Sequence, residues 1–314
     1  MSRIVVALGG NALGSTPAAQ AESIRAVAPA LVSLITAEDE IILTHGNGPQ
    51  VGAIVRAFRL AADTDPSVPR MPLPEATAMS QGYIGYHLQR EVQAEIARRG
   101  RPWHVASVVT QVVVDEGDPA FATPTKPIGS FMSREEAQAL VSADPGTVVA
   151  QDPQRGWRRV VASPRPREIV EWESILNLLD ADFVVVACGG GGIPVVREEG
   201  GTLRGVEAVV DKDFSAGLLA ESVGADTLLV LTSVEKVRLG RGTPEEREVD
   251  RLTSARAREL ARAGEFGPGS MEPKVLAGAD FVEGSPGRRA IIASIHQAGE
   301  ALAGRAGTLI TAGV

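Results

Sequence analysis

The sequence predicts an α/β fold with a mainly parallel sheet that helices cover on both faces. Three observations support this prediction. Short apolar, β-branched runs recur along the 314 residues, segments with helical spacing of apolar residues separate them, and several of the runs end in glycine-rich turns. Strands that alternate with helices are typical of parallel sheets buried on both sides. The length suits one large domain or two lobes.

The alternation is visible from the start of the chain. Residues 4–8 form a continuous apolar run, and the segment after them places Ile24, Val27 and Leu31 at helical spacing. The strongly β-branched segment 105–114 is predicted as one long strand or a hairpin. In this half the predicted strands are 3–8 and 40–43, and the predicted helices are 18–36, 50–60 and 75–99.

The composition changes in the middle of the chain, where residues 115–130 are rich in proline, glycine and acidic side chains. Ser133 and Glu136 have the spacing of a capping box, which predicts a short helix to about residue 142. Residues 147–150 and 157–161 are predicted to pair as a small hairpin. We therefore expect residues 115–165 to leave the main sheet as an excursion, such as a lid.

The second half repeats the alternation and shows no repeat of fixed period. Residues 244–249 are predicted as a polar loop. The predicted strands are 183–187, 227–231, 290–294 and 307–311, and the predicted helices are 168–179, 214–222, 255–262, 273–283 and 295–302.

Composition excludes several functional classes. The net charge is −8 with a pI near 5.2, and no cluster of basic residues indicates a nucleic-acid binder. The longest uncharged apolar stretch, residues 183–196, is too short to span a membrane. Cys188 is the only cysteine, so one chain can form neither an internal disulfide nor a thiolate zinc site. We expect Cys188 to be a small buried residue, and we expect the protein in a reducing cytoplasm.

Common cofactor and catalytic motifs are absent. No Gly-Lys pair occurs, which excludes a P-loop. Residues 46–52 resemble a dinucleotide fingerprint, but the third glycine comes one place late and Pro49 interrupts the pattern. The four histidines have no metal-ligand spacing. His45 lies inside a glycine-rich turn, where it either touches a substrate or hydrogen-bonds the loop.

Three glycine-rich turns follow predicted strands, at residues 9–11, 45–52 and 189–192. Glycine lets backbone N–H groups approach a ligand closely and turn inward, which suits anionic oxygens. The carboxyl ends of parallel strands meet at one edge of a sheet. The turns therefore predict one phosphate-binding crevice at that edge.

Three lysines lie in constrained settings. Lys212 stands between Asp211 and Asp213, just before a predicted helix that Asp213 is placed to cap; a cap with surface charges is the alternative interpretation. Lys274 lies in the first turn of a helix after a Gly/Pro-rich loop, where a bound anion would offset its unfavourable interaction with the helix dipole. Lys126 stands between two prolines. Cations and N–H donors around one anion are the requirement of phosphoryl transfer.

Over its whole length the chain resembles the carbamate kinase family of the amino acid kinase superfamily. The segment Thr-Lys-Pro-Ile-Gly is the most specific part. The matching blocks are Ala7-Leu8-Gly9-Gly10-Asn11-Ala12, His45-Gly46-Asn47-Gly48-Pro49-Gln50-Val51-Gly52, Gln81-Gly82-Tyr83-Ile84-Gly85-Tyr86, Thr110-Gln111-Val112-Val113-Val114-Asp115, Pro124-Thr125-Lys126-Pro127-Ile128-Gly129, Arg155-Gly156-Trp157-Arg158, Cys188-Gly189-Gly190-Gly191-Gly192-Ile193-Pro194, Asp211-Lys212-Asp213 and Pro268-Gly269-Ser270-Met271.

The resemblance implies a three-layer αβα sandwich, the amino acid kinase fold, as a single domain over residues 1–314. Its N-terminal half, about 1–180, would bind carbamate and would include a protruding subdomain near 115–165. Its C-terminal half, about 181–314, would bind the nucleotide. The implied reaction is ATP + carbamate ⇌ ADP + carbamoyl phosphate, with Mg²⁺, in a homodimer.

The resemblance also implies roles for individual residues. Lys126 would reach in from the protruding subdomain, Lys212 and Lys274 would hold phosphates and the transferring group, and Asp213 would orient them. No side chain is expected as a dedicated metal ligand. The substrate side would comprise Gly9, Gly10, Asn11, Asn47, Gly48, Gly189 and Gly190, and the nucleotide side Asp211, Lys212, Ser233, Val237, Met271 and Lys274.

Two departures from the family pattern stand out. Related kinases with other acceptors have a lysine where this chain has Ala7, and Lys126 would supply that charge from elsewhere. Residues 233–241 contain no aromatic side chain, which puts the details of adenine contact in doubt. Two alternative functions are a sibling kinase with another small acid as acceptor, and a catalytically silent sensor of nucleotide or carbamoyl phosphate.

Overall fold

An eight-stranded sheet forms the centre of the computed structural model, which describes residues 2–9, 14, 16–35, 39–152, 155–267 and 269–313. The strand order is β15-β17-β16-β12-β1-β2-β9-β3, and the six strands from β16 to β3 are parallel. β17 runs antiparallel to β16 and parallel to β15. The strands are β1 Ser2–Leu8, β2 Asp39–His45, β3 His104–Ser107, β9 Phe183–Val186, β12 Thr227–Thr232, β15 Arg251–Thr253, β16 Arg289–Ser294 and β17 Thr308–Thr311.

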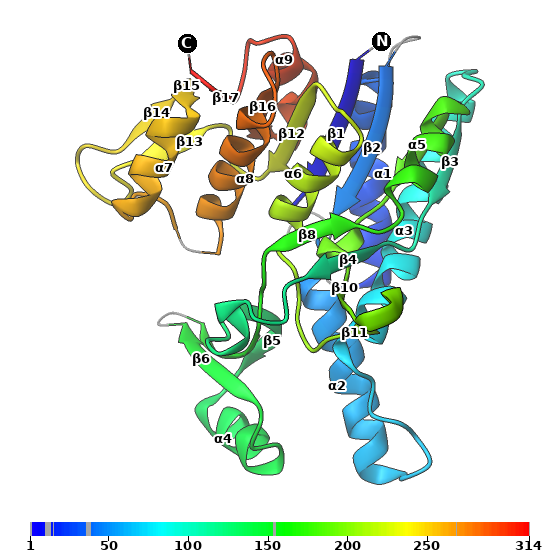
Figure 1. Ribbon diagram of the computed structural model, residues 1–314, viewed down its shortest axis with the longest axis vertical. Helices are drawn as coiled ribbons and strands as arrows, with labels where there is room; N and C mark the ends of the chain where they lie inside the picture. Colours follow the sequence, from blue (N-terminus) through cyan, green and yellow to red (C-terminus); the bar gives the residue numbers. More distant parts are fainter. Residues whose placement is uncertain are drawn as a thin grey trace.

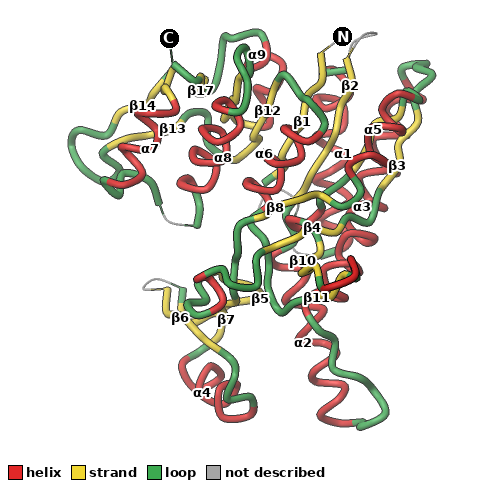
Figure 2. Tube along the Cα trace, in the orientation of Figure 1, coloured by secondary structure: helices red, strands yellow, loops and turns green. Residues whose placement is uncertain are grey.

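Helices lie on both sides of this sheet (Figures 1 and 2). None of the described helices is long and apolar enough to cross a membrane. The helices are α1 Pro17–Ser33, α2 Gly48–Thr64, α3 Leu73–Arg98, α4 Arg134–Ala143, α5 Trp172–Asp180, α6 Lys212–Ser222, α7 Ser254–Arg262, α8 Met271–Glu283 and α9 Ala298–Leu302.

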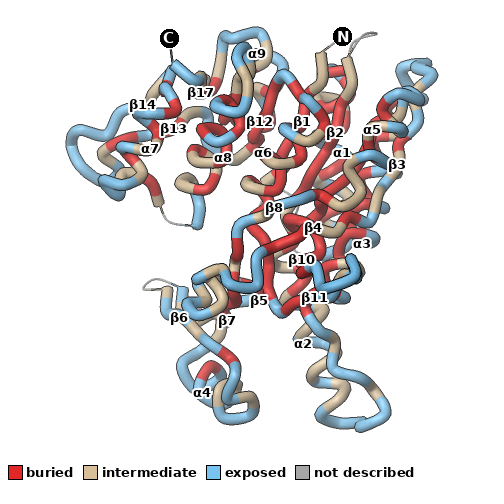
Figure 3. The backbone as a smooth tube through the Cα atoms, viewed as in Figure 1, coloured by how far each residue is buried: buried red, intermediate tan, exposed pale blue. Residues whose placement is uncertain are grey.

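The side chains of β1 alternate between two hydrophobic cores. Val5 and Ala7 pack with α5, α6, α7 and α8, whereas Ile4, Val6 and Leu8 pack with α1, α3 and α9. Because successive strand residues point to opposite faces, this division requires a helical layer on each side of the sheet. The predicted three-layer αβα sandwich with a mainly parallel sheet is confirmed. Figure 3 shows the central strands buried and α4 largely exposed.

A three-stranded sheet lies apart from the central one (Figure 1). Its strands are β5 Lys126–Met132, β7 Gly156–Val161 and β6 Val148–Asp152, in that order and antiparallel. α4 begins with the predicted capping box of Ser133 and Glu136. The predicted hairpin and short helix of the excursion are therefore present.

The three-stranded sheet meets α2 through two glycines. A Cβ atom on Gly52 of α2 would lie 2.1 Å from the Cα of Gly129 in β5, and Gly129 itself has a φ of +71°. Gly52 has no room for a side chain, and the positive φ of Gly129 disfavours one there, so the two backbones pack in direct contact. This contact places the middle of β5 beside the N-terminal part of α2.

Four predicted elements were wrong in part. Residues 105–114 are neither one strand nor a hairpin: β3 joins the central sheet, whereas β4 Gln111–Val114 pairs with β10 Ile193–Arg197 and β8 Pro166–Ile169 in a second sheet that β11 Leu203–Gly205 completes. Part of the helix predicted at 168–179 is β8, and α5 begins only at Trp172. The polar loop at 244–249 contains β14 Arg247–Val249, paired with β13 Val237–Leu239. Residues 295–297 form a 3₁₀ turn before α9.

The Gly52–Gly129 contact predicts opposite effects of alanine at two helical glycines. Gly52→Ala should lower the unfolding free energy by about 1–3 kcal/mol, as overpacking does, because the new methyl group meets backbone. Gly82→Ala in α3 should raise it by about 0.5–1 kcal/mol, because nothing lies within 4 Å of the added Cβ and alanine favours a helix. Urea unfolding of both variants measures the two changes in unfolding free energy. Equal changes would contradict the packing argument.

Candidate active site

A cleft of about 880 Å³ lies at the carboxyl edge of the central sheet. It is lined by residues from all three glycine-rich turns, including Gly9, Gly46 and Gly190. β1, β2 and β9 are parallel neighbours, so the turns after them fall at the same edge. The backbone also links the turns, since Gly9 N–H donates to the Leu231 carbonyl at 3.0 Å and Gly46 N–H to the Leu8 carbonyl at 3.3 Å.

The second turn places a buried histidine and a buried asparagine side by side. His45 donates from Nδ1 to the Gly46 carbonyl at 3.1 Å, which requires the proton on Nδ1 in the neutral ring. Burial, together with the positive charge of Lys212, lowers the pKa of His45 to about 4. Asn47 lines the cleft, and its Nδ2 donates to Ser80 Oγ at 2.8 Å. His45 thus hydrogen-bonds the loop, which was one of its two predicted roles.

The third turn needs its glycines for close packing against the second. A Cβ on Gly189 would lie 2.4 Å from His45 Nε2, and one on Gly190 would lie 2.1 Å from Asn47 Nδ2. Gly190 lines the cleft with a φ of +68°. Gly189 lies behind it, where its carbonyl accepts a hydrogen bond from Gln81 Nε2 at 3.0 Å. Cys188, just before these glycines, is fully buried as predicted.

Asp213 is shared by two lysines from different helices. Its Oδ1 accepts from Lys212 Nζ at 2.5 Å, and its Oδ2 accepts from Lys274 Nζ at 2.8 Å. The Asp213 side chain is only 4% exposed. Burial alone would raise the pKa of Asp213, but the two ammonium groups hold it well below its ordinary value. Burial lowers the pKa of Lys212, and the charge of Lys274 acts in the same direction.

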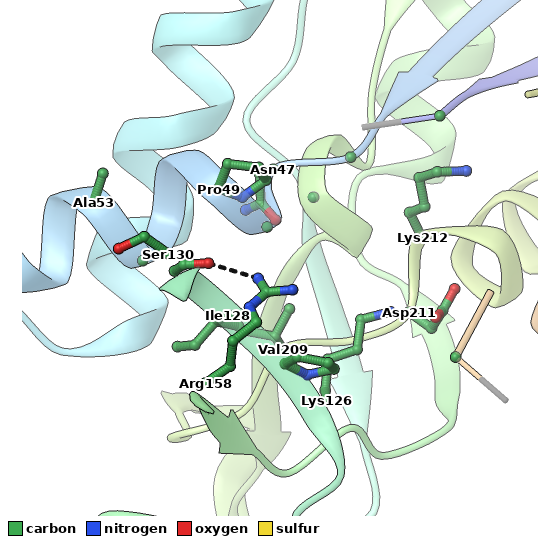
Figure 4. Close-up of a pocket in the computed structure, with 18 of the residues that line it drawn as sticks. Asn47, Pro49, Ala53, Lys126, Ile128, Ser130, Arg158, Val209, Asp211 and Lys212 are labelled. Carbon is green, nitrogen blue, oxygen red and sulfur yellow. Dashed lines mark hydrogen bonds and ion pairs between the residues drawn. The ribbon is translucent and has the colours of Figure 1, made fainter. Parts of the chain in front are cut away.

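Asp211 connects the protruding sheet to α6. Its Oδ1 accepts from the Asp213 N–H at 2.9 Å, so Asp211 is the N-cap of α6, and its Oδ2 is paired with Lys126. The prediction that Asp213 caps the helix was wrong, because the helix begins at Lys212 and only the residue before it can serve as cap. Lys126, Asp211 and Lys212 all face the cleft (Figure 4).

The cleft is cationic although the chain carries a net charge of −8. Its described lining contains two carboxylates, Asp211 and Asp213, against six basic side chains. These are Arg56, Lys126, Arg155, Arg158, Lys212 and Lys274. Such a field attracts anionic ligands and concentrates them at the cleft.

The remaining predicted site residues lie in different places. Gly48 and Ser233 line the cleft. Val237 lies outside the described lining: it is fully buried in the core, and its N–H donates to Thr308 Oγ1 at 2.9 Å. Met271, the first residue of α8, packs against the core instead of lining the cleft. Gly10 and Asn11 lie outside the residues that the structure describes.

Sequence reasoning missed the arginines of the cleft and one further signal. The chain contains only four lysines, at positions 126, 212, 236 and 274, among 31 basic residues. Three of the four line the cleft. Most basic residues of this chain are arginines, but lysines occur at the cleft. A lysine offers a compact ammonium on a flexible stem, whereas an arginine offers a planar guanidinium. This bias could have selected four positions without any motif, three of which line the cleft.

Comparison with known proteins gives consistent matches over the full length. The model of the amino acid kinase family matches residues 2–294. The carbamate kinase-like protein YqeA of Escherichia coli K12 is 48% identical over 308 residues, 98% of each chain. The carbamate kinase of Clostridium perfringens is 46% identical over 313 residues, 98% of this chain and 99% of its own. The structure of carbamate kinase from Giardia lamblia bound to AMP-PNP has a TM-score of 0.88 at 39% identity, covering 99% of this chain and 98% of that one.

The buried His45 predicts a loss of stability in weak acid. Its pKa is about 4 in the folded protein and about 6.5 when unfolded, so the unfolded chain binds the extra proton first. This contribution to stability is complete above pH 6.5 and falls as the pH drops toward 4. Between pH 7 and 4.5 the wild type should lose about 2–3 kcal/mol more unfolding free energy than His45→Gln, as urea titrations would measure. Parallel losses in both proteins would contradict the assignment.

Proposed function

The chain belongs to the amino acid kinase family, and from this premise we propose that it catalyses ATP + carbamate ⇌ ADP + carbamoyl phosphate. One observation carries the proposal: Lys126, Lys212 and Lys274 converge on one cleft with glycine-rich turns, and Asp213 holds two of them. The full-length similarity to carbamate kinases supports this choice of acceptor.

In the proposed reaction the lysines stabilise the transferring phosphoryl group. Charge spreads over its oxygens in the transition state, so fixed cations lower the barrier. Lys212 and Lys274 are positioned through the same carboxylate, which sets their separation before substrate binds. Carbamate is itself an anion, and its attacking oxygen needs no general base. The chemistry therefore depends on positioning and charge, which this cleft supplies.

Lys126 is the mobile member of the cluster in this proposal. It lies on β5 of the protruding sheet, and its ammonium is paired with Asp211. A phosphate group with more charge than one carboxylate would compete for that ammonium. Lys126 would then move from Asp211 to the transferring group while Asp211 keeps its helix-capping bond through Oδ1.

The nucleotide phosphates would bind at the start of α8. Gly269, Ser270 and Lys274 line the cleft there, and the first turn of a helix offers free N–H groups to anions. Asp211 and Ser233 complete the nucleotide side that we propose, whereas Met271 and Val237 pack in the core behind it. The Giardia relative with AMP-PNP bound supports an adenine nucleotide as a ligand of this chain.

Mg²⁺ fits this site as a companion of the nucleotide. Among the described residues no group of three or more His, Cys, Asp or Glu side chains is arranged to hold a metal. Mg²⁺ commonly binds through one or two carboxylates together with substrate phosphates. Asp211 and Asp213 are the carboxylates at hand, although both are already paired with lysines. When bound, the ion would neutralise charge on the β- and γ-phosphates.

We extend the proposal to the organisation of the chain. The N-terminal half, about 1–180, would bind carbamate through Gly9, Gly10, Asn11, Asn47 and Gly48, and residues near 115–165 would act as a protruding lid. From the other half, Gly190 would lie at the substrate side with Gly189 behind it. The C-terminal half, about 181–314, would bind the nucleotide. The protein would function as a homodimer.

Loss of single lysines tests the proposal. Lys126→Ala and Lys274→Ala should each lower kcat by roughly 10²-fold, the usual loss for a transition-state charge partner. Lys236→Ala is the matched control, because Lys236 pairs with Asp250 and lies outside the described lining of this cleft. The assay is ADP formation from ATP with carbamate supplied by bicarbonate and ammonia, and its reversal with carbamoyl phosphate.

Three results would contradict the assignment. Near-normal kinetics in either cleft variant would refute the role of that lysine. Faster turnover with another small acid would indicate a sibling kinase. Wild-type turnover no higher than that of Lys212→Ala would indicate a silent sensor.

A further inference from the structure

We propose that Arg165 is a positioning residue that keeps Lys126 at a fixed distance from the two lysines bound to Asp213. The inference rests on the proposed function, and it concerns a side chain outside the described lining of the cleft. Arg165 lies in the connector between β7, which ends at Val161, and β8, which begins at Pro166. It therefore belongs to the root through which the protruding sheet joins the rest of the protein.

The guanidinium of Arg165 contacts both helices that carry the lysine pair. Its Cζ lies 3.4 Å from the centroid of the Phe214 ring, the shortest such distance among the described cation–π pairs. Its Nη1 donates to Asp280 Oδ2 at 3.2 Å. Phe214 follows Asp213 in α6, and Asp280 lies further along α8 than Lys274. A planar guanidinium on the face of an aromatic ring keeps its orientation, so Arg165 braces the connector against α6 and α8.

The backbone of the connector is also held at several points. The Arg165 N–H donates to Asp118 Oδ2 at 2.9 Å, which ties the returning end of the excursion to its outgoing end. The Ala162 carbonyl accepts a hydrogen bond from the Val209 N–H at 2.9 Å. Prolines precede and follow Arg165, and they restrict the backbone dihedral angles there. The brace made by the side chain is therefore transmitted to the strand that enters the connector.

The same root positions Lys126. Lys126 is the partner of Val161 in the pairing of β5 with β7, and Ala162 directly follows Val161. A displacement of the connector relative to α6 would therefore move Lys126 as well. The other two lysines would stay in place, because Asp213 holds both of them from α6 and α8. Arg165 thus controls the distance between the cation of the protruding sheet and the cations of the helices.

We expect the brace to affect the reaction more than the stability of the fold. The side chains of Arg165 and Asp280 are 46% and 42% exposed, and solvent screens an ion pair of this kind. Phosphoryl transfer depends on placement, and a displacement of about 1 Å can lower a rate by about 10²-fold. During transfer Lys126 would have left Asp211, so that ion pair could not hold the sheet in place at that moment. The brace at the root would then set the position of Lys126.

Arg167 provides a matched comparison two residues further along the chain. It lies in β8, its side chain is 63% exposed, and it forms an ion pair with Asp115 at 3.9 Å. Asp115 directly follows β4, the strand that pairs with β8, so this ion pair stays within one small sheet. Arg165 and Arg167 both form exposed ion pairs, but the described partners of Arg165 are on α6 and α8. This difference makes the two arginines a test pair.

The test is steady-state kinetics in the direction of ATP formation, together with urea unfolding of each variant. Arg165→Gln should lower kcat about 10-fold and change KM for ADP less than about twofold, because the lysines on the nucleotide side stay in place. Phe214→Leu removes the ring and should act like Arg165→Gln, whereas Phe214→Tyr keeps the ring and should not. Arg167→Gln should leave kcat near that of the wild type. The two glutamine variants should have equal unfolding free energies.

A double-mutant cycle with Lys126 separates positioning from a merely structural role. If Arg165 acts by placing Lys126, Arg165→Gln should lower kcat less than about twofold in a protein that already carries Lys126→Ala. A structural role would lower kcat by the same factor in both backgrounds. Equal factors would therefore overturn the inference.

The remaining outcomes distinguish this inference from the proposed function. A wild type without turnover would refute the proposed function, and this inference would fall with it. An active wild type whose kcat is unchanged by Arg165→Gln would refute the inference alone. A fall in kcat that Arg167→Gln shares would show a general effect of exposed arginines at the root and would also overturn it.

Discussion

The shared carboxylate of Asp213 is the interaction on which the site depends. Two ammonium groups in one partly buried cleft repel each other, and each also loses hydration. Asp213 compensates both at once through its two oxygens, at 2.5 and 2.8 Å from Lys212 and Lys274. The lysines come from α6 and α8, so one carboxylate fixes the separation of two helix starts. Without it, neither charge could be kept in place before a phosphate binds.

Close backbone packing forms the walls of the cleft around these charges. Three glycine-rich turns approach one another so closely that a single methyl group at Gly189 or Gly190 would overlap His45 or Asn47. The same principle joins the protruding sheet to α2 at Gly52 and Gly129. Glycine serves two purposes here. It lets neighbouring elements pack in contact, and it lets backbone atoms lie at the cleft without side chains. The conflict between dense packing and an open anion site is resolved by removing side chains.

The sequence predicted the fold better than it predicted the site. Alternating apolar runs and helical periods were sufficient for the layers, because both signals are local. The prediction for residues 105–114 failed because a β-branched run does not show where it is divided. Residues 108–110 separate it into two strands that join different sheets. Sequence order likewise could not show that Arg158 reaches the cleft, since that depends on how β5, the partner of β7, docks against α2 through the glycine pair. The lysines were found because glycines, prolines and acids next to them in sequence marked their positions.

The distribution of lysine and arginine in the cleft suits a division of tasks. A lysine ammonium is a compact charge on a flexible stem, which can follow a phosphoryl group as it moves between two oxygens. Lys126 illustrates this, since its partner Asp211 can release it without losing the helix cap. A guanidinium is rigid and planar, so the arginines of the cleft offer positive charge of more fixed orientation. In a chain with four lysines among 31 basic residues, three lysines line the cleft together with three arginines.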